Sequence, residues 1–93
     1  MKKTSAEVRA MVLAGEPLPE NLHVEGSLYL TGCTGLTELP EDLYVGGWLD
    51  LAGCTSLTEL PKGLHVGGSL YLTGCTGLTE LPEDLYVGWS IYR

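Results

Sequence analysis

The chain has 93 residues, of which 44% are hydrophobic, and a formal net charge of -7 at pH 7. This length accommodates a single domain, and no apolar run approaches the roughly 18 residues that a membrane-spanning helix needs. The acidic balance argues against binding to nucleic acid or to an anionic membrane, because both are recognised by basic patches.

Residues 4–14 are predicted to form a short helix. Thr4 suits the N-cap position with Glu7 three residues later, which is the spacing of a capping box. One apolar stripe with helical spacing consists of Val8, Met11 and Val12. Gly15 suits the C-terminal end of the helix, and Pro17 blocks its continuation.

A unit of 21 residues repeats along the rest of the chain, and its first and third copies are identical letter for letter. A fixed period of this length is typical of a solenoid in which each coil stacks on its neighbour. The first coil of such a stack needs a lid, so residues 1–17 are interpreted as an N-terminal cap. The single domain, 1–93, then divides into a half repeat (18–25), three repeats (26–46, 47–67 and 68–88) and a truncated fourth strand (89–93).

Each repeat opens with alternating apolar residues, as a β-strand with one buried face requires. In the middle repeat these residues are Val45, Gly47, Leu49 and Leu51. The glycine provides no side chain, so the core is expected to be thinner there and the strand to curve differently. Later in the repeat, Pro61 excludes a helix interior and suits an extended return.

The pattern LxLxxCxxLxxLPxxL resembles the leucine-rich repeat, with cysteine in place of the usual asparagine, and its length resembles the short bacterial class. The resemblance implies an α/β repeat solenoid with a parallel sheet of about four strands on its concave face and an N-terminal capping helix. It also implies a non-enzymatic module that binds a protein partner through that face. The Val-Gly-Gly entry to each strand departs from the family, most members of which carry a leucine there.

Aromatic side chains gather at the outward positions of the predicted strands, where the repeats also vary. One column of repeat positions contains Tyr29, Asp50, Tyr71 and Tyr92, and Trp48 stands in the column beside it. Such residues form protein-binding hot spots or sugar-stacking platforms. The alternative is that exposed aromatics only stabilise the pairing of neighbouring strands. The candidate partner-binding residues are Tyr29, Trp48, Asp50, Tyr71 and Tyr92.

The last five residues open a fourth repeat that has no cap of its own. An uncapped strand presents unpaired backbone groups, which predicts self-association as a homodimer about a two-fold axis. The candidate self-association residues are Trp89, Ile91 and Tyr92; Trp89 is alternatively a lid over the core. Identical repeats in so short a chain also indicate recent duplication or an engineered array.

No catalytic residue, cofactor or metal site is predicted, because the sequence shows no nucleophile–base pair, metal cluster or phosphate loop. Two histidines share a repeat column with two tyrosines, which indicates surface packing; this column contains His23, Tyr44, His65 and Tyr86. The three cysteines also share one column, which indicates buried thiols in a reducing compartment. A cytoplasmic location is therefore expected, and resemblance to bacterial effector repeats leaves delivery into a host cell open. The column contains Cys33, Cys54 and Cys75.

Overall fold

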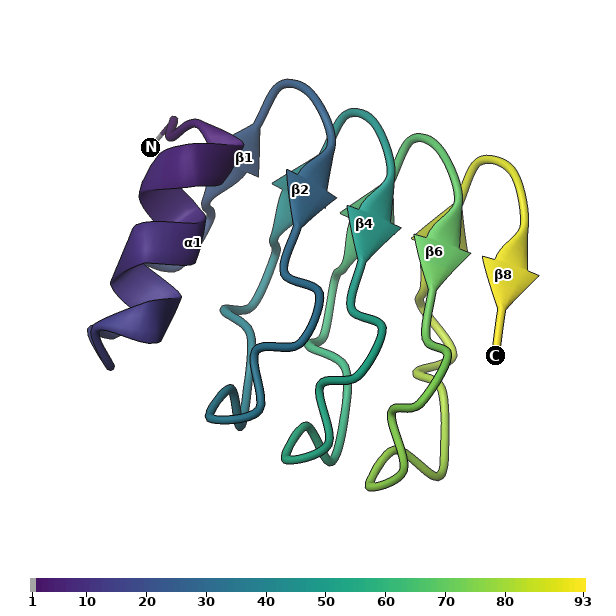
Figure 1. The fold of residues 1–93 in the computed structure, drawn as a ribbon. Coiled ribbons are helices and arrows are strands. Elements are labelled where there is room, and N and C mark those ends of the chain that lie inside the picture. Colours follow the sequence, from purple (N-terminus) through teal and green to yellow (C-terminus); the bar gives the residue numbers. More distant parts are fainter. Residues whose placement is uncertain (1) are drawn as a thin grey trace.

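The chain forms a parallel β-solenoid of about 3 turns with one short helix, as seen in a computed structural model that describes residues 2–93 (Figure 1). Helix α1 (Ser5–Leu13) lies at one end of the stack, and the C-terminus lies at the other end. The strands are β1 (His23–Val24), β2 (Leu28–Tyr29), β3 (Tyr44–Val45), β4 (Leu49–Asp50), β5 (His65–Val66), β6 (Leu70–Tyr71), β7 (Tyr86–Val87) and β8 (Ile91–Tyr92). The helix is too short to cross a membrane, and no other helix is present in residues 2–93.

The strands form two parallel sheets, in the orders β1-β3-β5-β7 and β2-β4-β6-β8. The expected parallel sheet of about four strands is present, but the structure adds a second sheet of four strands, because each alternating stretch bends in its middle. In the middle repeat, β3 ends at Val45 and β4 begins only at Leu49. Each coil thus contributes one strand to each sheet.

The bend between the two sheets occurs at the Gly-Gly step, where neighbouring coils lie very close together. A Cβ atom at Gly67 would overlap the backbone carbonyl oxygen of Gly46 in the preceding coil. Gly88 stands in the same relation to Gly67. A backbone oxygen held in the coil cannot move aside as a flexible side chain can, so a larger residue is excluded here.

The register of both sheets places equivalent positions of successive repeats side by side. Leu28 pairs with Leu49, Leu49 with Leu70, and Leu70 with Ile91. Every column of the repeat therefore becomes a ladder in space, with a spacing of about 4.8 Å between strands. This register makes the core one continuous cluster of leucine, valine and cysteine side chains.

The cysteine column is a ladder of buried free thiols, which confirms the prediction of their burial. The Sγ atom of Cys54 donates to the carbonyl oxygen of Leu30 at 3.1 Å, and that of Cys75 donates to Leu51 at 2.9 Å. These thiols therefore satisfy carbonyl groups of the preceding coil. Burial raises the pKa of Cys54 to about 11 and also raises the pKa of Cys75.

Helix α1 begins and ends as the sequence predicts. The Thr4 hydroxyl accepts from the N–H of Glu7 at 3.2 Å, and the N–H of Thr4 donates to the Glu7 carboxylate at 3.1 Å. This backbone hydrogen bond lowers the pKa of Glu7. Beyond the C-terminus of the helix, Gly15 adopts a left-handed conformation with φ of 76°.

Helix α1 packs on the first coil and hydrogen-bonds the outer edge of β2. Val8 is fully buried in the core. The Ser5 hydroxyl accepts from the N–H of Tyr29 at 3.2 Å, and Arg9 Nη1 donates to the Tyr29 and Thr31 carbonyl oxygens at 3.2 and 3.1 Å. Side chains thus take the place of the strand that would pair with β2 in a further coil.

Candidate functional site

The partner-binding residues expected from the sequence lie on the outer face of the sheet β2-β4-β6-β8. Strand pairing places Tyr29 beside Asp50, Asp50 beside Tyr71, and Tyr71 beside Tyr92. Tyr29 and Tyr92 are each 48% exposed and Trp48 is 41% exposed, whereas Asp50 and Tyr71 are half-buried. The face therefore presents a large aromatic surface to solvent.

Three of the four aromatic rings on this face contact one another. The rings of Tyr71 and Tyr92 stack with centroids 4.8 Å apart and planes 9° apart. Trp48 meets Tyr71 edge-on, at 6.0 Å and 66°. The indole of Trp48 lies over Gly68 of the next coil, where a Cβ atom would overlap it. Trp48, Tyr71 and Tyr92 thus form one cluster, which is called the aromatic cluster below.

Asp50 separates Tyr29 from the aromatic cluster. Its Oδ1 atom accepts a hydrogen bond from the N–H of Ala52 at 3.0 Å, which holds the carboxylate close to the backbone. Within residues 2–93 the ion pair present is Lys2–Glu25, at 2.9 Å, and no cationic side chain lies within 4.0 Å of Asp50. The negative charge of Asp50 is therefore uncompensated on this face.

A second aromatic column lies on the other sheet, β1-β3-β5-β7. Its rings stack face to face with centroid distances of 4.4, 4.6 and 4.4 Å, in the order His23, Tyr44, His65 and Tyr86. The sequence shows that these residues share a column, but not that their rings form an unbroken stack. Both histidines are therefore packed between or against tyrosine rings.

The C-terminal end of the core is less well covered than its middle. Ile91 is 39% exposed, whereas Leu70, which precedes it in the same column, is fully buried. The side chain of Trp89 is 73% exposed and therefore does not act as a lid, although its N–H donates to the carbonyl oxygen of Gly68 at 3.2 Å. Tyr92 belongs both to this end and to the aromatic cluster.

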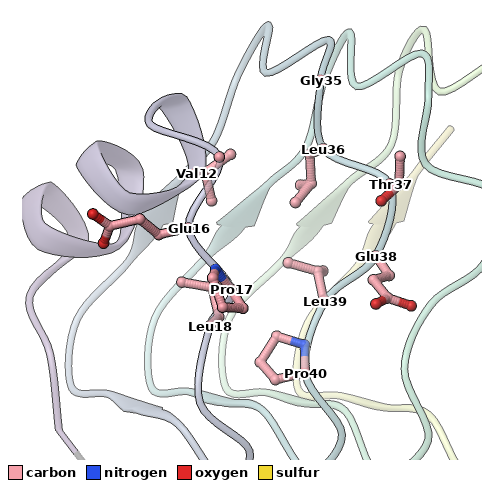
Figure 2. Close-up of a pocket in the computed structure, with 11 residues that line it drawn as sticks. Val12, Glu16, Pro17, Leu18, Gly35, Leu36, Thr37, Glu38, Leu39 and Pro40 are labelled. Carbon is pink, nitrogen blue, oxygen red and sulfur yellow. The ribbon is translucent and has the colours of Figure 1, made fainter.

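Hollows also lie away from the predicted site residues. One, of about 260 Å³, lies between α1 and the first coil; Figure 2 shows Val12 and Leu36 on facing walls of this hollow. A larger groove, of about 590 Å³, follows the returns of successive coils and carries several carboxylates, among them Glu38 and Glu59. Residues 2–93 contain no group of three histidine, cysteine or acidic side chains that could hold a metal ion.

The aromatic face is the surface on which the expected partner-binding residues lie. Comparison of the chain with protein-family models, with curated proteins and with solved structures gave no match.

Proposed function

We propose that the chain is a non-enzymatic protein-interaction module of the leucine-rich-repeat type, which binds a protein partner through the concave face formed by β2-β4-β6-β8. The observation that carries this proposal is the exposed aromatic cluster. Tryptophan and tyrosine dominate protein-binding hot spots because they bury a large area and lose little side-chain entropy. Mutual stacking restrains these rings before a partner arrives, which lowers the entropic cost of binding further.

The contacts of Tyr71 with both Trp48 and Tyr92 gather the three rings into one surface. Such a surface suits the apolar side chains and backbone of a polypeptide. The buried free thiols support a reducing compartment, such as the cytoplasm, as the place of action.

The proposal is tested by selecting peptides from a random display library on the folded chain and measuring their affinities by calorimetry. Trp48→Ser is the informative variant, because the neighbouring repeats carry serine at this position and the fold should tolerate it. Loss of a hot-spot tryptophan should weaken binding by a factor of roughly 30 or more.

The matched control is Tyr86→His. This position lies in the aromatic column of the other sheet, in which histidine and tyrosine alternate, so histidine should be tolerated there. This variant should bind the selected peptides with unchanged affinity. Peptides that bind equally well to Trp48→Ser, or a selection that returns no binder, would refute the proposal. In that case the exposed rings would serve only to stabilise strand pairing.

The second candidate function is self-assembly of this 93-residue chain as a homodimer through its C-terminal strand edge. The observation in its favour is the contrast between Ile91 and the fully buried Leu70. Light scattering behind gel filtration should show a dimer at concentrations on the order of tens of micromolar, and Ile91→Lys should convert it to a monomer. A wild-type chain that remains monomeric across the concentration series excludes this function.

A further inference from the structure

We propose that the gap at Asp50 in the tyrosine column is a binding slot for a planar cation, the guanidinium group of an arginine in the partner. This inference rests on the proposed function, because it assumes that the partner approaches the aromatic face. It adds the chemical identity of the group that the face selects.

The slot arises because one ring is missing from an otherwise regular column. Tyr71 and Tyr92 show the natural spacing of rings in this column, with centroids 4.8 Å apart. Tyr29 and Tyr71 pair with Asp50 from either side, so they are separated by two strand spacings, or about 9.6 Å. The space between their rings is therefore as thick as one stacked aromatic ring. A guanidinium is flat and stacks on aromatic faces, so it matches this space in shape.

The charge of the slot matches the same group. The Asp50 carboxylate lies at the base of the gap, where the N–H of Ala52 fixes its Oδ1 atom and leaves Oδ2 free. No lysine, arginine or histidine of residues 2–93 lies within 4.0 Å of it. A guanidinium between the two tyrosines can donate to this carboxylate while both of its faces contact π systems. The net charge of -7 additionally favours the approach of a cationic segment.

The slot is specific to the middle coil. Trp48 lies over Gly68 and contacts Tyr71, so its indole leans toward the next coil and borders the slot on the Tyr71 side. In the two identical repeats the outward residues are serine, tyrosine and threonine, whereas the middle repeat has Trp48, Asp50 and Ala52. All three outward positions have thus changed together, which opens a space and adds a charge at one place.

Arg9 is engaged elsewhere. Its Nη1 atom donates to the backbone carbonyl oxygens of Tyr29 and Thr31, at the edge of β2 that helix α1 covers. Among residues 2–93 no cationic side chain forms an ion pair with Asp50, so the cation comes from another molecule.

The test is a titration of the isotope-labelled chain, followed by amide NMR spectra, with three small probes. These are N-acetyl-arginine methylamide, the corresponding lysine compound, and the neutral citrulline compound, which keeps the planar shape without the charge. The arginine probe should shift the amide signals of Tyr29, Asp50 and Tyr71 in a saturable way. The lysine and citrulline probes should each bind roughly tenfold more weakly, because one lacks planarity and the other lacks charge.

Two substitutions at the slot separate shape from charge. Asp50→Tyr restores the residue of the neighbouring repeats and fills the gap, so saturable binding of arginine should disappear. Asp50→Asn keeps an oxygen for the N–H of Ala52 but removes the charge, so the affinity for arginine should fall to that for citrulline. Tyr86→His, on the other sheet, should bind the arginine probe as wild type does.

Three results would overturn the inference. The amide shifts caused by the arginine probe could persist in Asp50→Tyr, or the lysine probe could cause equal shifts. The shifts could also map to the groove that carries Glu38 and Glu59. Failure of the slot can be told apart from failure of the proposed function. If selected peptides still require Trp48 but bind Asp50→Tyr with unchanged affinity, the face is a binding surface and the slot is not part of it.

Discussion

A buried leucine in the middle of a ladder and its half-exposed counterpart at the end should respond very differently to truncation. Leu49 is fully buried between Leu28 and Leu70. Leu49→Ala therefore removes buried apolar surface and also leaves an enclosed cavity. Such changes cost about 2–5 kcal/mol. Ile91, in the same column, is 39% exposed and is contacted by a coil on one side only.

The expected cost of Ile91→Ala follows from that exposure. Complete burial of an isoleucine side chain is worth about 1.5–3 kcal/mol, and roughly three-fifths of this side chain is buried, so the loss should be about 1–2 kcal/mol. No enclosed cavity adds to it, because the end of the coil is open to solvent. The free energy of unfolding of a domain of this size is about 5–15 kcal/mol, so both effects are measurable.

The assay is urea unfolding of the two variants and the wild type, monitored by circular dichroism and tryptophan fluorescence. Leu49→Ala should lower the free energy of unfolding by about 2 kcal/mol more than Ile91→Ala does, which is the difference between the midpoints of the two ranges. Equal losses would refute the reasoning that each coil is stabilised only by its neighbours. If those equal losses depended on protein concentration, the terminal coil would be covered by a second copy of the chain.

Three further predictions concern the backbone, the thiols and the helix. Gly67→Ala should destabilise the chain by about 1–3 kcal/mol in urea unfolding, because the new methyl group meets a backbone oxygen. The control is Gly35→Ala, whose methyl group meets no atom and which should be close to neutral. Similar costs for the two variants would contradict the close approach of the coils. Because burial raises the pKa of Cys54 to about 11, the neutral thiol stabilises the fold at pH values below the ordinary value near 9.0, and this contribution is lost as the pH rises through 11. Unfolding free energies measured between about pH 8 and 11 should therefore fall more steeply in the wild type than in Cys54→Ser, which keeps a donor that does not titrate; parallel profiles would exclude this cause. Arg9→Met keeps the apolar stem of the side chain but loses the hydrogen bonds to the edge of β2. This loss should lower the stability by about 1–2 kcal/mol, measured by thermal unfolding. An unchanged midpoint temperature would show that water replaces the guanidinium fully.

The sequence predicts the solenoid well because its information is periodic. The 21-residue repeat fixes which residues share a column, and parallel pairing in register then makes each column a ladder, as for Leu28, Leu49 and Leu70. The capping box of Thr4 and Glu7 is a local signal and is found as predicted. These features depend on spacing alone, so they can be read without knowledge of the packing.

The division into two sheets could not be read from the same spacing. The alternation through Val45, Gly47 and Leu49 is equally consistent with one long strand. The decisive constraint is the distance between neighbouring coils, which leaves no room for a Cβ atom at Gly67. The glycine of the repeat indicates that the strand curves there, but it does not show how closely the coils approach, because that distance is a property of the stacked structure.

For the candidate site, the sequence predicts which residues share a face but not how their rings lie. The column from Tyr29 to Tyr92 follows from the repeat, whereas the stacking of Tyr71 on Tyr92 and the tilt of Trp48 over Gly68 depend on side-chain rotamers. The role of Arg9 at the edge of β2 was also not predicted, because its hydrogen-bond partners are backbone carbonyls 20 and more residues away.

The hydrogen bonds from Ser5 and Arg9 to the edge of β2 also bear on aggregation. At the same end of the stack, the N–H of Lys3 donates to the carbonyl oxygen of His23, which occupies the edge of β1. Within residues 2–93, these hydrogen bonds engage backbone groups of β1 and β2 that would otherwise be unpaired at this end of the stack, and they therefore hinder another chain from adding a strand there.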